Sequence, residues 1–459
     1  MKRYGAYRET NMSWCGEIPE TWDIHTVHSV FQERKEKNSP KKTDAILSLT
    51  AQQGVIPYSE KKSGGNKAKE DITLYHLAYP GDLVMNSMNI VSGSVGLSKY
   101  YGAISPVYYA LHVRDEWHDI RYYAYLFGLA TFQRSLLPLG NGILMKVSST
   151  GKLNTVRKRI SMEKFNNVEL PAPPIEEQHQ IVRYLDAKTA QIDCAVHGYE
   201  RLIALLEERK TAVINEAVTK GVRRGVEMKK SGVDWLGEIP AHWEISNVKK
   251  HFHIQKDIAG REGYDVLSIT QTGLKKKNIA SNEGQMANDY SGYQFVHQGE
   301  FAMNHMDLLT GYIGLSPYFG VTSPDYRVFV LDDKETCDAK YFLYVFQLGY
   351  KRKIFYKFGR GAASKGRWRL PARAFLDYVI PLPPIDEQRD IVRLIDEQQA
   401  KLDKAIAGIQ REIELLHERR TRLVSDVVTG QVDVRTEVLD DGDGCVGAGA
   451  GEADHALSV

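Results

Sequence analysis

Two long stretches of the chain place apolar residues at alternating steps of three and four. The first occupies residues 175–217 and the second residues 385–427. Each follows a Pro-Pro pair and has an acidic first turn, which suits the positive end of a helix dipole. A 3-4 spacing over about six heptads is typical of a coiled-coil seam. The predicted seam residues are Ile181, Leu185, Ile192, Val196, Ile203 and Leu206 in the first stretch, and Ile391, Ile395, Leu402, Ile406, Ile413 and Leu416 in the second.

These two stretches predict long helices that pack on each other. Each would extend roughly 65 Å at 1.5 Å per residue. A lone helix exposing such an apolar stripe would be unstable in water. We therefore expect each helix to bury its stripe against the other.

The rest of each half of the chain has the pattern of a mixed domain. Short apolar runs alternate with Gly, Pro and Ser, as strands and turns do. A helix-like aromatic stretch at residues 121–127 is matched by another at 340–346. The pattern predicts an α+β domain with a strongly twisted or partly closed sheet. The clearest strand candidates are residues 45–49, 82–85, 107–111 and 326–330.

The two halves are copies of one unit. The segment W-C-G-E-I-P at residues 14–19 recurs as W-L-G-E-I-P at 235–240. The segment P-A-P-P-I-E-E-Q at 171–178 recurs as P-L-P-P-I-D-E-Q at 381–388. Matches that keep their order across a chain indicate duplication, here of about 210–220 residues.

The repeat and the change of period predict five parts. The last one is rich in Gly, Ala and acidic residues, which is the composition of a disordered tail. The predicted parts are a first globular domain at 1–170, a first long helix with linker at 171–222, a second globular domain at 223–380, a second long helix at 381–437 and the tail at 438–459.

The composition is that of an ordinary globular protein. It is 42% apolar and 26% charged, with a formal net charge of +2, which excludes collagenous and broadly disordered proteins. The four cysteines form no C-x-x-C pair, so neither a zinc site nor a disulfide framework is expected. No apolar run is long enough for a membrane helix, and the first residues lack the apolar core of a secretory signal. We expect a cytoplasmic protein with no membrane association.

Basic residues gather in one stretch of each half. No acidic residue occurs in residues 121–160 or 340–373. Stretches whose charged residues are all positive, with Gly-rich loops and aromatic residues, suit binding to a phosphate backbone. The alternative is ordinary surface charge paired with acidic residues from elsewhere. The candidate phosphate contacts are Lys152, Arg157, Arg159, Arg360, Lys365, Arg367 and Arg369.

Polar residues that follow one predicted strand in each half are candidates for reading bases. Gln52 and Gln53 follow the strand at 47–49, and Gln271 and Thr272 follow its repeat. Gln can pair with the major-groove edge of adenine. The alternative interpretation is that these are merely polar turn residues.

Enzyme motifs are missing from the sequence. It has no strand-linked G-x-G-x-x-G, no Asn-Pro-Pro-aromatic tetrapeptide and no H-E-x-x-H. We therefore expect a binding protein with no catalytic residues, and no metal or cofactor bound by this chain.

The ordered motifs resemble those of the specificity subunit of type I restriction-modification systems. They are W-x-G-E-I-P-x-x-W, G-[DE]-x-x-x-N-x-M, S-P-x-Y, a basic Gly-rich loop and P-P-I-x-E-Q before a long helix, each present twice within residues 12–435. The resemblance implies an α+β fold with two tandem pseudo-symmetric α/β target-recognition domains, joined by two long helices in an antiparallel coiled coil. It also implies a non-catalytic subunit.

The resemblance further implies the partners. These are double-stranded DNA, two modification subunits that bind S-adenosylmethionine and methylate adenine, and restriction subunits that cleave DNA with ATP and Mg²⁺. Each recognition domain would read half of a bipartite target, while the helices set the spacer and dock the modification subunits. The alternatives are a DNA methyltransferase with diverged motifs, and a structural or RNA-binding protein that uses a helical hairpin as an arm.

Overall fold

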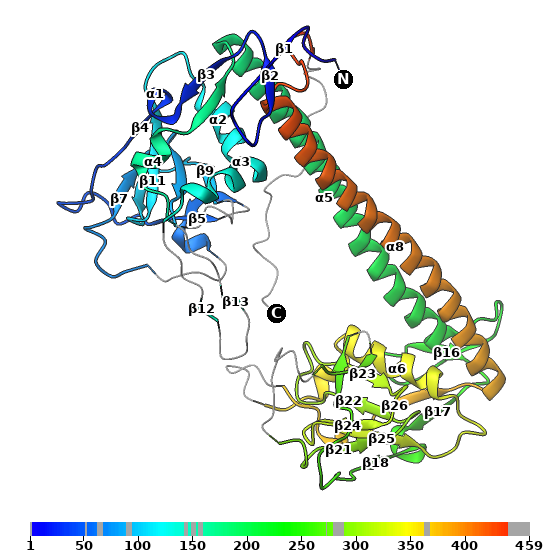
Figure 1. Ribbon diagram of the computed structural model, residues 1–459. Helices are drawn as coiled ribbons and strands as arrows, with labels where there is room; N and C mark the ends of the chain where they lie inside the picture. Colours follow the sequence, from blue (N-terminus) through cyan, green and yellow to red (C-terminus); the bar gives the residue numbers. More distant parts are fainter. Residues whose placement is uncertain are drawn as a thin grey trace. The chain divides into compact units, whose positions relative to one another are not determined.

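The computed structural model describes residues 2–50, 53–61, 68–88, 94–141, 146–147, 153–154, 159–271, 273–278, 289–361 and 368–438. The chain forms two compact units (Figure 1). The first unit comprises Met1–Gly198 and Arg411–Val459, and the second comprises Tyr199–Gln410. Each unit therefore holds one mixed domain and one half of each long helix. The predicted tail at 438–459 lies outside the described residues except for Val438.

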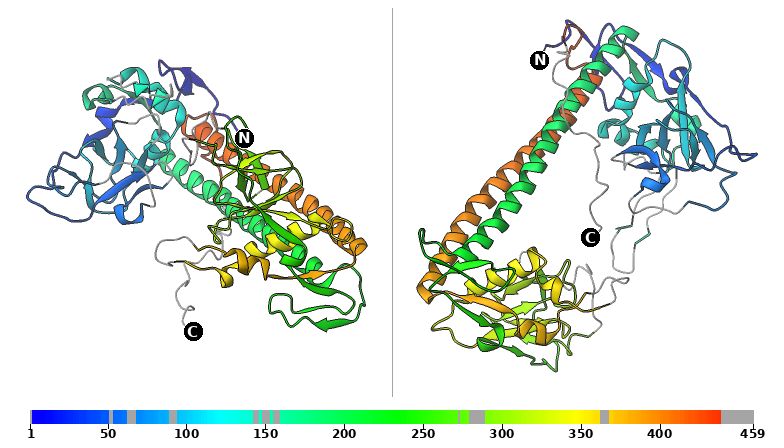
Figure 2. Two further views of the ribbon diagram at one scale, coloured as in Figure 1. Left: turned by 90° about the horizontal axis from the view of Figure 1, so that it is seen from below. Right: turned by 180° about the vertical axis from the view of Figure 1, so that it is seen from behind.

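The two long helices are α5 (Ile175–Lys220) and α8 (Ile385–Val428). They run alongside each other in every view (Figures 1 and 2). Arg420 Nε lies 3.2 Å from Asp193 Oδ1 in the first unit, and Lys210 Nζ lies 2.7 Å from Asp403 Oδ1 in the second. On α5 Asp193 precedes Lys210 by 17 residues, and on α8 Asp403 precedes Arg420 by 17. Both ion pairs therefore fit one antiparallel register.

The predicted seam residues fall into two groups. Those nearest the start of each helix, Ile181, Leu185, Ile391 and Ile395, are fully buried in the core of the domain that precedes the helix. Those farther along are buried or half-buried on the helical pair. The apolar stripe of each helix therefore serves two contacts in turn, first with a domain and then with the other helix.

The domain of the first unit is built around a four-stranded antiparallel sheet. Its order is β4-β11-β8-β9. Short helices and two of the smaller strand pairs, β1–β2 and β3–β14, pack on one face, and the pairs β5–β6 and β7–β10 pack on the other. The sheet strands are β4 (Phe31–Glu33), β11 (Tyr108–Val113), β8 (Leu83–Asn86) and β9 (Val95–Leu97). The other strand pairs are β1 (Tyr7–Glu9) with β2 (Glu17–Pro19), β3 (Asp23–Thr26) with β14 (Glu169–Ala172), β5 (Leu47–Thr50) with β6 (Gly54–Pro57), β7 (His76–Ala78) with β10 (Gly102–Ile104), and β12 (Lys146–Val147) with β13 (Leu153–Asn154). The helices are α1 (Val27–Val30), η1 (Tyr58–Glu60), α2 (Ile120–Phe127), α3 (Ala130–Ser135), η3 (Leu137–Leu139) and α4 (Met162–Asn166).

Alternation along these strands separates two cores. Side chains of successive strand residues point to opposite faces. Leu83 and Met85 of β8 join the larger core with the helices, whereas Val84 joins a smaller core beneath β5 and β6. The sheet is thus buried on both faces, which fixes the register of its strands.

The second unit repeats this plan. Its central sheet has the order β18-β25-β22-β23 and the same alternation, with Phe301 and Met303 in the larger core and Ala302 in the smaller one. The sheet strands are β18 (Phe252–Gln255), β25 (Arg327–Leu331), β22 (Phe301–Met303) and β23 (Ile313–Leu315). The other strand pairs are β15 (Met228–Lys230) with β16 (Glu238–Pro240), β17 (Glu244–Asn247) with β26 (Val379–Leu382), β19 (Leu267–Thr270) with β20 (Gly273–Lys276), and β21 (Gln294–Val296) with β24 (Gly320–Thr322). The helices are η4 (Val248–Lys250), α6 (Ala339–Lys351), η6 (Phe355–Phe358) and α7 (Ala372–Leu376).

The predicted fold class is therefore confirmed. Two pseudo-symmetric α+β domains each continue into a long helix, and the two helices are antiparallel. The units differ in connectivity at one place. In the second unit the chain runs on from α5 into β15, whereas in the first the segment after α8 lies beside the N-terminal segment. Asp433 N donates to Lys2 O at 2.9 Å and Tyr7 Oη donates to Gly430 O at 3.0 Å.

A buried glutamine joins each domain to its long helix. Gln178 Oε1 accepts from Asp119 N, the N-cap of α2, at 2.8 Å, and Gln178 Nε2 donates to Pro173 O at 2.7 Å. Gln388 repeats both contacts in the second unit, with Asp338 N and Pro383 O at 2.8 Å each. The last residue of P-P-I-x-E-Q thus holds the start of one helix against the start of another.

The glutamate before each glutamine is buried against the W-x-G-E-I-P-x-x-W motif. Glu177 Oε1 accepts from Trp22 Nε1 at 2.9 Å and from the Tyr4 hydroxyl. In the second unit Glu387 Oε2 lies 2.8 Å from His242 Nε2, whereas Glu387 Oε1 and Trp243 Nε1 are buried without a hydrogen-bond partner among the described residues. We call Glu177 with Gln178, and Glu387 with Gln388, the Glu-Gln clamps. The two motifs that revealed the repeat are therefore in contact.

A glycine ends each long helix beside the same tryptophan. Gly430, at φ 72°, follows α8, and a Cβ there would lie 2.4 Å from Pro19 Cδ and 3.0 Å from Trp22 Cη2. Gly221, at φ 73°, follows α5, and a Cβ there would lie 3.0 Å from Trp243 Cζ2. Both the left-handed backbone and the close approach require glycine.

No helix in the described part of the chain is long and apolar enough to cross a bilayer.

Removing one clamp glutamine should destabilise its own unit. Gln178→Ala and Gln388→Ala each leave a buried N–H and buried carbonyl groups without partners, so we expect the free energy of unfolding of that unit to fall by about 2–3 kcal/mol. Urea unfolding followed by tryptophan fluorescence measures this, because Trp22 and Trp243 lie in the two cores. The control is Gln410→Ala on the exposed face of α8, which should change stability by less than about 0.5 kcal/mol. Equal urea midpoints for Gln178→Ala and the control would contradict a structural role of the motif.

Candidate nucleic-acid interface

A two-residue backbone bridge stands at the base of each predicted basic loop. Asn141 N donates to Arg159 O at 2.8 Å, and Arg159 N donates to Asn141 O at 3.1 Å. Arg360 and Arg369 form the same pair of bonds at 2.8 and 3.0 Å. We call these bridges the first and second necks. Lys152, Arg157, Lys365 and Arg367 fall between the bridge residues and lie outside the described residues.

Each neck is fixed to the end of a central strand. Ile160 N donates to Ser87 O at 3.1 Å, and Leu370 N donates to His305 O at 2.9 Å. Ser87 follows β8 and His305 follows β22, within the repeated N-x-M part of the sequence. Ile160 and Leu370 are buried, which anchors the base of each loop in the larger core.

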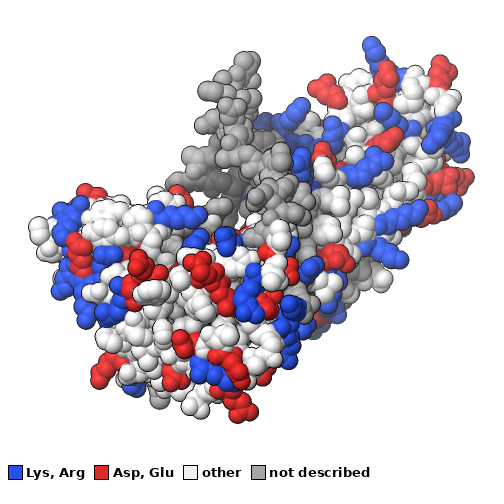
Figure 3. Space-filling model, turned by 90° about the horizontal axis from the view of Figure 1, so that it is seen from above, with Lys and Arg blue, Asp and Glu red and all other residues white. Residues whose placement is uncertain are grey.

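The three predicted phosphate contacts that the structure describes are all exposed. Arg159, Arg360 and Arg369 lie on the two necks, and no carboxylate of the described residues is within ion-pair distance of them. On the face drawn in Figure 3, by contrast, basic and acidic residues are interspersed, as is usual for a solvated surface. The neck arginines are therefore available to an anionic ligand.

The predicted base-reading glutamines are turn residues of two hairpins. Gln53 closes the loop between β5 and β6, where its N–H donates to Thr50 Oγ1 at 3.0 Å, and Gln271 begins the turn between β19 and β20. Both are exposed. Gln52 and Thr272 lie outside the described residues.

The hairpin turn and the neck lie at the same end of each domain. In the first unit a parallel bridge joins Ile46, just before β5, to Ala103 of β10. The two strands therefore run in the same direction, and the turn after β5 lies at the end of the domain where β10 ends. The chain then enters β11, whose first residue, Tyr108, pairs with Asn86, next to Ser87. In the second unit the parallel bridge joins Val266 to Val321, and β25 starts opposite Met303. Each unit thus presents a polar turn beside a basic neck.

The sequence did not reveal the residues beneath the necks. Tyr109 of β11 is buried, and its hydroxyl donates to Ile160 O at 2.8 Å. Its equivalent on β25 is Arg327, whose Nη2 donates to Leu370 O at 3.0 Å. Burial lowers the pKa of Arg327 to about 10, so the guanidinium remains charged at neutral pH. The only sequence signal was an arginine after S-P-D-Y where the first copy has S-P-V-Y-Y.

An aromatic stack also borders the second neck. Tyr356 and Trp368 stack with ring centroids 5.3 Å apart, and Trp368 Nε1 donates to Tyr356 O at 2.7 Å. A Cβ on Gly359 would lie 2.0 Å from Trp368 Nε1, so the stack requires a glycine there. The corresponding segment of the first unit, Leu137–Leu139, has no aromatic residue.

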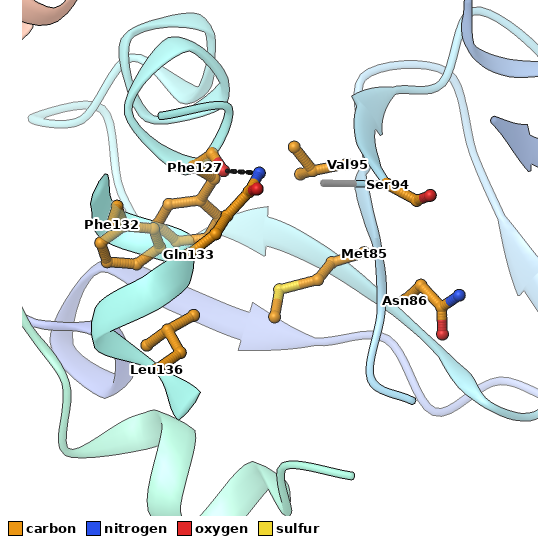
Figure 4. Close-up of a pocket in the computed structure, with 8 residues that line it drawn as sticks. All are labelled: Met85, Asn86, Ser94, Val95, Phe127, Phe132, Gln133 and Leu136. Atoms are coloured by element: carbon orange, nitrogen blue, oxygen red, sulfur yellow. Dashed lines mark hydrogen bonds between the residues drawn. The ribbon is translucent and has the colours of Figure 1, made fainter. Parts of the chain in front are cut away.

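A cavity in the first domain is too small for a nucleotide or cofactor. It measures about 10 Å³, room for one water molecule at most. Figure 4 shows its apolar lining around Met85, with Gln133 Nε2 donating to Phe127 O at 2.8 Å. Among the described residues, no group of three or more His, Cys, Asp or Glu is placed to hold a metal ion.

Comparison with known proteins assigns the chain to a family. The family model for the type I restriction modification DNA specificity domain matches residues 19–197 and 244–415, one match for each copy. The putative type I restriction enzyme MjaX specificity subunit of Methanocaldococcus jannaschii is 22% identical over 94% of this chain and 98% of its own length. The type I restriction enzyme MjaVIII specificity subunit of the same organism is 22% identical over 94% and 97%.

A solved structure has the same fold. Its source is a study of complex assembly and conformational transition of the type I R-M system. It matches with a TM-score of 0.61 at 12% identity, covering 90% of this chain and 99% of that one. The family match leaves no ground for the diverged methyltransferase or the RNA-binding arm. The chain belongs to the family of type I restriction-modification specificity subunits, the non-catalytic subunits that recognise DNA.

Proposed function

We propose that each unit reads one half of a bipartite duplex target, and that unread base pairs separate the halves. The supporting observation is the duplication of one arrangement, a polar hairpin turn beside a basic neck, at the same end of both domains. The recognition domains correspond to residues 1–170 and 223–380, the helical parts to 171–222 and 381–437, and the tail to 438–459. Cellular duplex DNA is the ligand, so we expect the protein in the cytoplasm.

The two half-sites should differ in sequence. Asn141 of the first neck corresponds to Arg360 of the second, and the aromatic stack of Tyr356 and Trp368 borders the second neck alone among the described residues. Base recognition depends on the side chains that reach the grooves. The full target is therefore expected to be non-palindromic.

The partners dock on surfaces that the helical pair presents twice. Leu205 of α5 and Leu415 of α8 occupy equivalent positions and are 54% and 41% exposed, respectively. Apolar residues exposed at two symmetric places suit two copies of one partner. These partners are the modification subunits, which carry S-adenosylmethionine, and restriction subunits join the assembly with ATP and Mg²⁺.

The neck arginines should contact phosphates. Arg360→Ala with Arg369→Ala is expected to weaken binding of the assembled complex to every duplex and to lower the slope of log K against log salt by about two. Base preference should not change, because phosphate contacts carry no direct sequence information. Fluorescence anisotropy over a salt series measures both quantities. Arg373→Ala is the control, since that side chain is 95% exposed but lies outside the neck, on α7. An altered base preference would reverse the assignment.

The turn glutamines should read bases. Gln271→Ala is expected to change the bases preferred at the second half-site, because a contact to a base edge is worth about 1–3 kcal/mol of discrimination. Gln53→Ala is the matched variant and should affect the first half-site alone. Mapping methylated adenines in cells that carry the complete system reports both sites. Unchanged targets for both variants would leave the glutamines as turn residues only.

The helical pair should set the spacer. The antiparallel register places the bond after Leu206 opposite the bond after Ile406, so seven residues inserted at both points preserve every existing pair. The pair then lengthens by about 10 Å, and the unread spacer should grow by about three base pairs. Methylation mapping should show unchanged half-sites. The control is the same insertion in α5 alone, which breaks the register and should abolish assembly. An unchanged spacer in the double insertion would show that another element sets it.

A further inference from the structure

The second neck rests on a buried positive charge that the first neck lacks. Arg327 and Tyr109 occupy the same position of the central sheet, and each is 6% exposed. Each donates one hydrogen bond to the carbonyl of the residue after the neck. A neutral tyrosine therefore suffices for this structural contact, and the charge of Arg327 needs another reason.

Burial of this charge is costly within the folded chain. The other polar contact of Arg327 is from Nη1 to Met303 Sδ at 3.7 Å, and its guanidinium lies 5.4 Å from the centre of the Phe375 ring. No carboxylate of the described residues is within ion-pair distance of it. A buried charge without a counter-ion normally destabilises a protein. The missing negative charge can come from a ligand.

His305 marks where that ligand would sit. It occupies the position of Ser87, whose hydroxyl is satisfied by Val107 O at 2.7 Å. His305 Nδ1 is buried and has no hydrogen-bond partner among the described residues. Burial first, and then the positive charges of Arg327 and Arg369, lower the pKa of His305 to about 4, while the exposed Asp325 acts weakly in the opposite direction. Backbone contacts place these residues at the neck, because Leu370 N donates to His305 O at 2.9 Å and Arg327 Nη2 donates to Leu370 O at 3.0 Å.

We propose that Arg369, His305 and Arg327 form an anion site that holds a DNA phosphate at the second half-site, with Arg327 as a positioning residue that acts from beneath. This inference rests on the proposed function and extends it. An exposed arginine binds the phosphate, and the buried charge strengthens that attraction through the poorly screening interior. The described necks differ in how their charge is held. At the first, Lys164 Nζ donates to Asn141 Oδ1 at 2.9 Å and Arg159 is exposed, whereas the second has Arg327 buried beneath it.

The test exchanges Arg327 for the residue that the first unit uses. Arg327→Tyr preserves a donor for Leu370 O and removes the charge. In the complex with its modification subunits, binding to target duplex at physiological salt should weaken about tenfold, and the slope of log K against log salt should fall by close to one. The methylated sequence should stay the same. The melting temperature of the chain should not fall, because a buried charge without a counter-ion has been removed.

Two comparisons make the outcome decisive. Arg373→Gln, an exposed arginine on α7, should leave affinity and slope unchanged. If Arg327→Tyr lowers the melting temperature and leaves the salt slope unchanged, Arg327 is structural and the inference is overturned. If Arg360→Ala with Arg369→Ala also leaves the slope unchanged, the second neck does not bind DNA and the proposed function itself fails. If the salt slope falls for Arg360→Ala with Arg369→Ala but not for Arg327→Tyr, only the role of Arg327 is refuted.

Discussion

The pairing of a buried glutamine with the start of a neighbouring helix is the contact on which both units depend. Gln178 and Gln388 each satisfy the N-cap backbone of α2 or α6 and a carbonyl in the turn before the long helix. Because these groups are buried, each glutamine has almost no tolerance for movement. The start of each long helix is consequently joined to its domain by buried hydrogen bonds as well as by the chain itself.

The clamp also explains why the two repeated motifs remain alike while other segments differ. Glu177 accepts from Trp22 and Glu387 pairs with His242, both within the other motif, and a left-handed glycine closes each helix against the tryptophan ring. Substitution of either glutamate removes a buried hydrogen bond, and a side chain in place of either glycine forces a steric clash. The neck positions face solvent and meet no such requirement, so Asn141 and Arg360 can occupy equivalent sites. The buried clamp residues are thus constrained by packing, whereas the exposed neck residues can differ between the two units.

The sequence predicted the periodic features well and the junctions poorly. A 3-4 repeat after Pro-Pro specified α5 and α8 because helix period and capping are local properties, and the duplication was visible because clamp residues resist change. The structural role of Gln178 could not be read from the chain, since its partner Asp119 is distant in sequence. Arg327 lies outside the acid-free stretches, and its burial could not be read from the sequence because it depends on strand pairing with β22.

Duplication followed by unequal change accounts for the difference between the necks. Both copies need a donor beneath the neck, and Tyr109 shows that a neutral one serves at no electrostatic cost. Arg327 keeps that bond and adds a charge that no carboxylate of the described residues neutralises. A residue that lowers the stability of the free protein can persist if ligand binding restores that stability, because a ligand stabilises the folded state that it binds. The proposed phosphate contact would supply such a recovery at the second neck. The long helices keep the two domains on one chain, so binding by one domain raises the effective concentration of the other at the DNA.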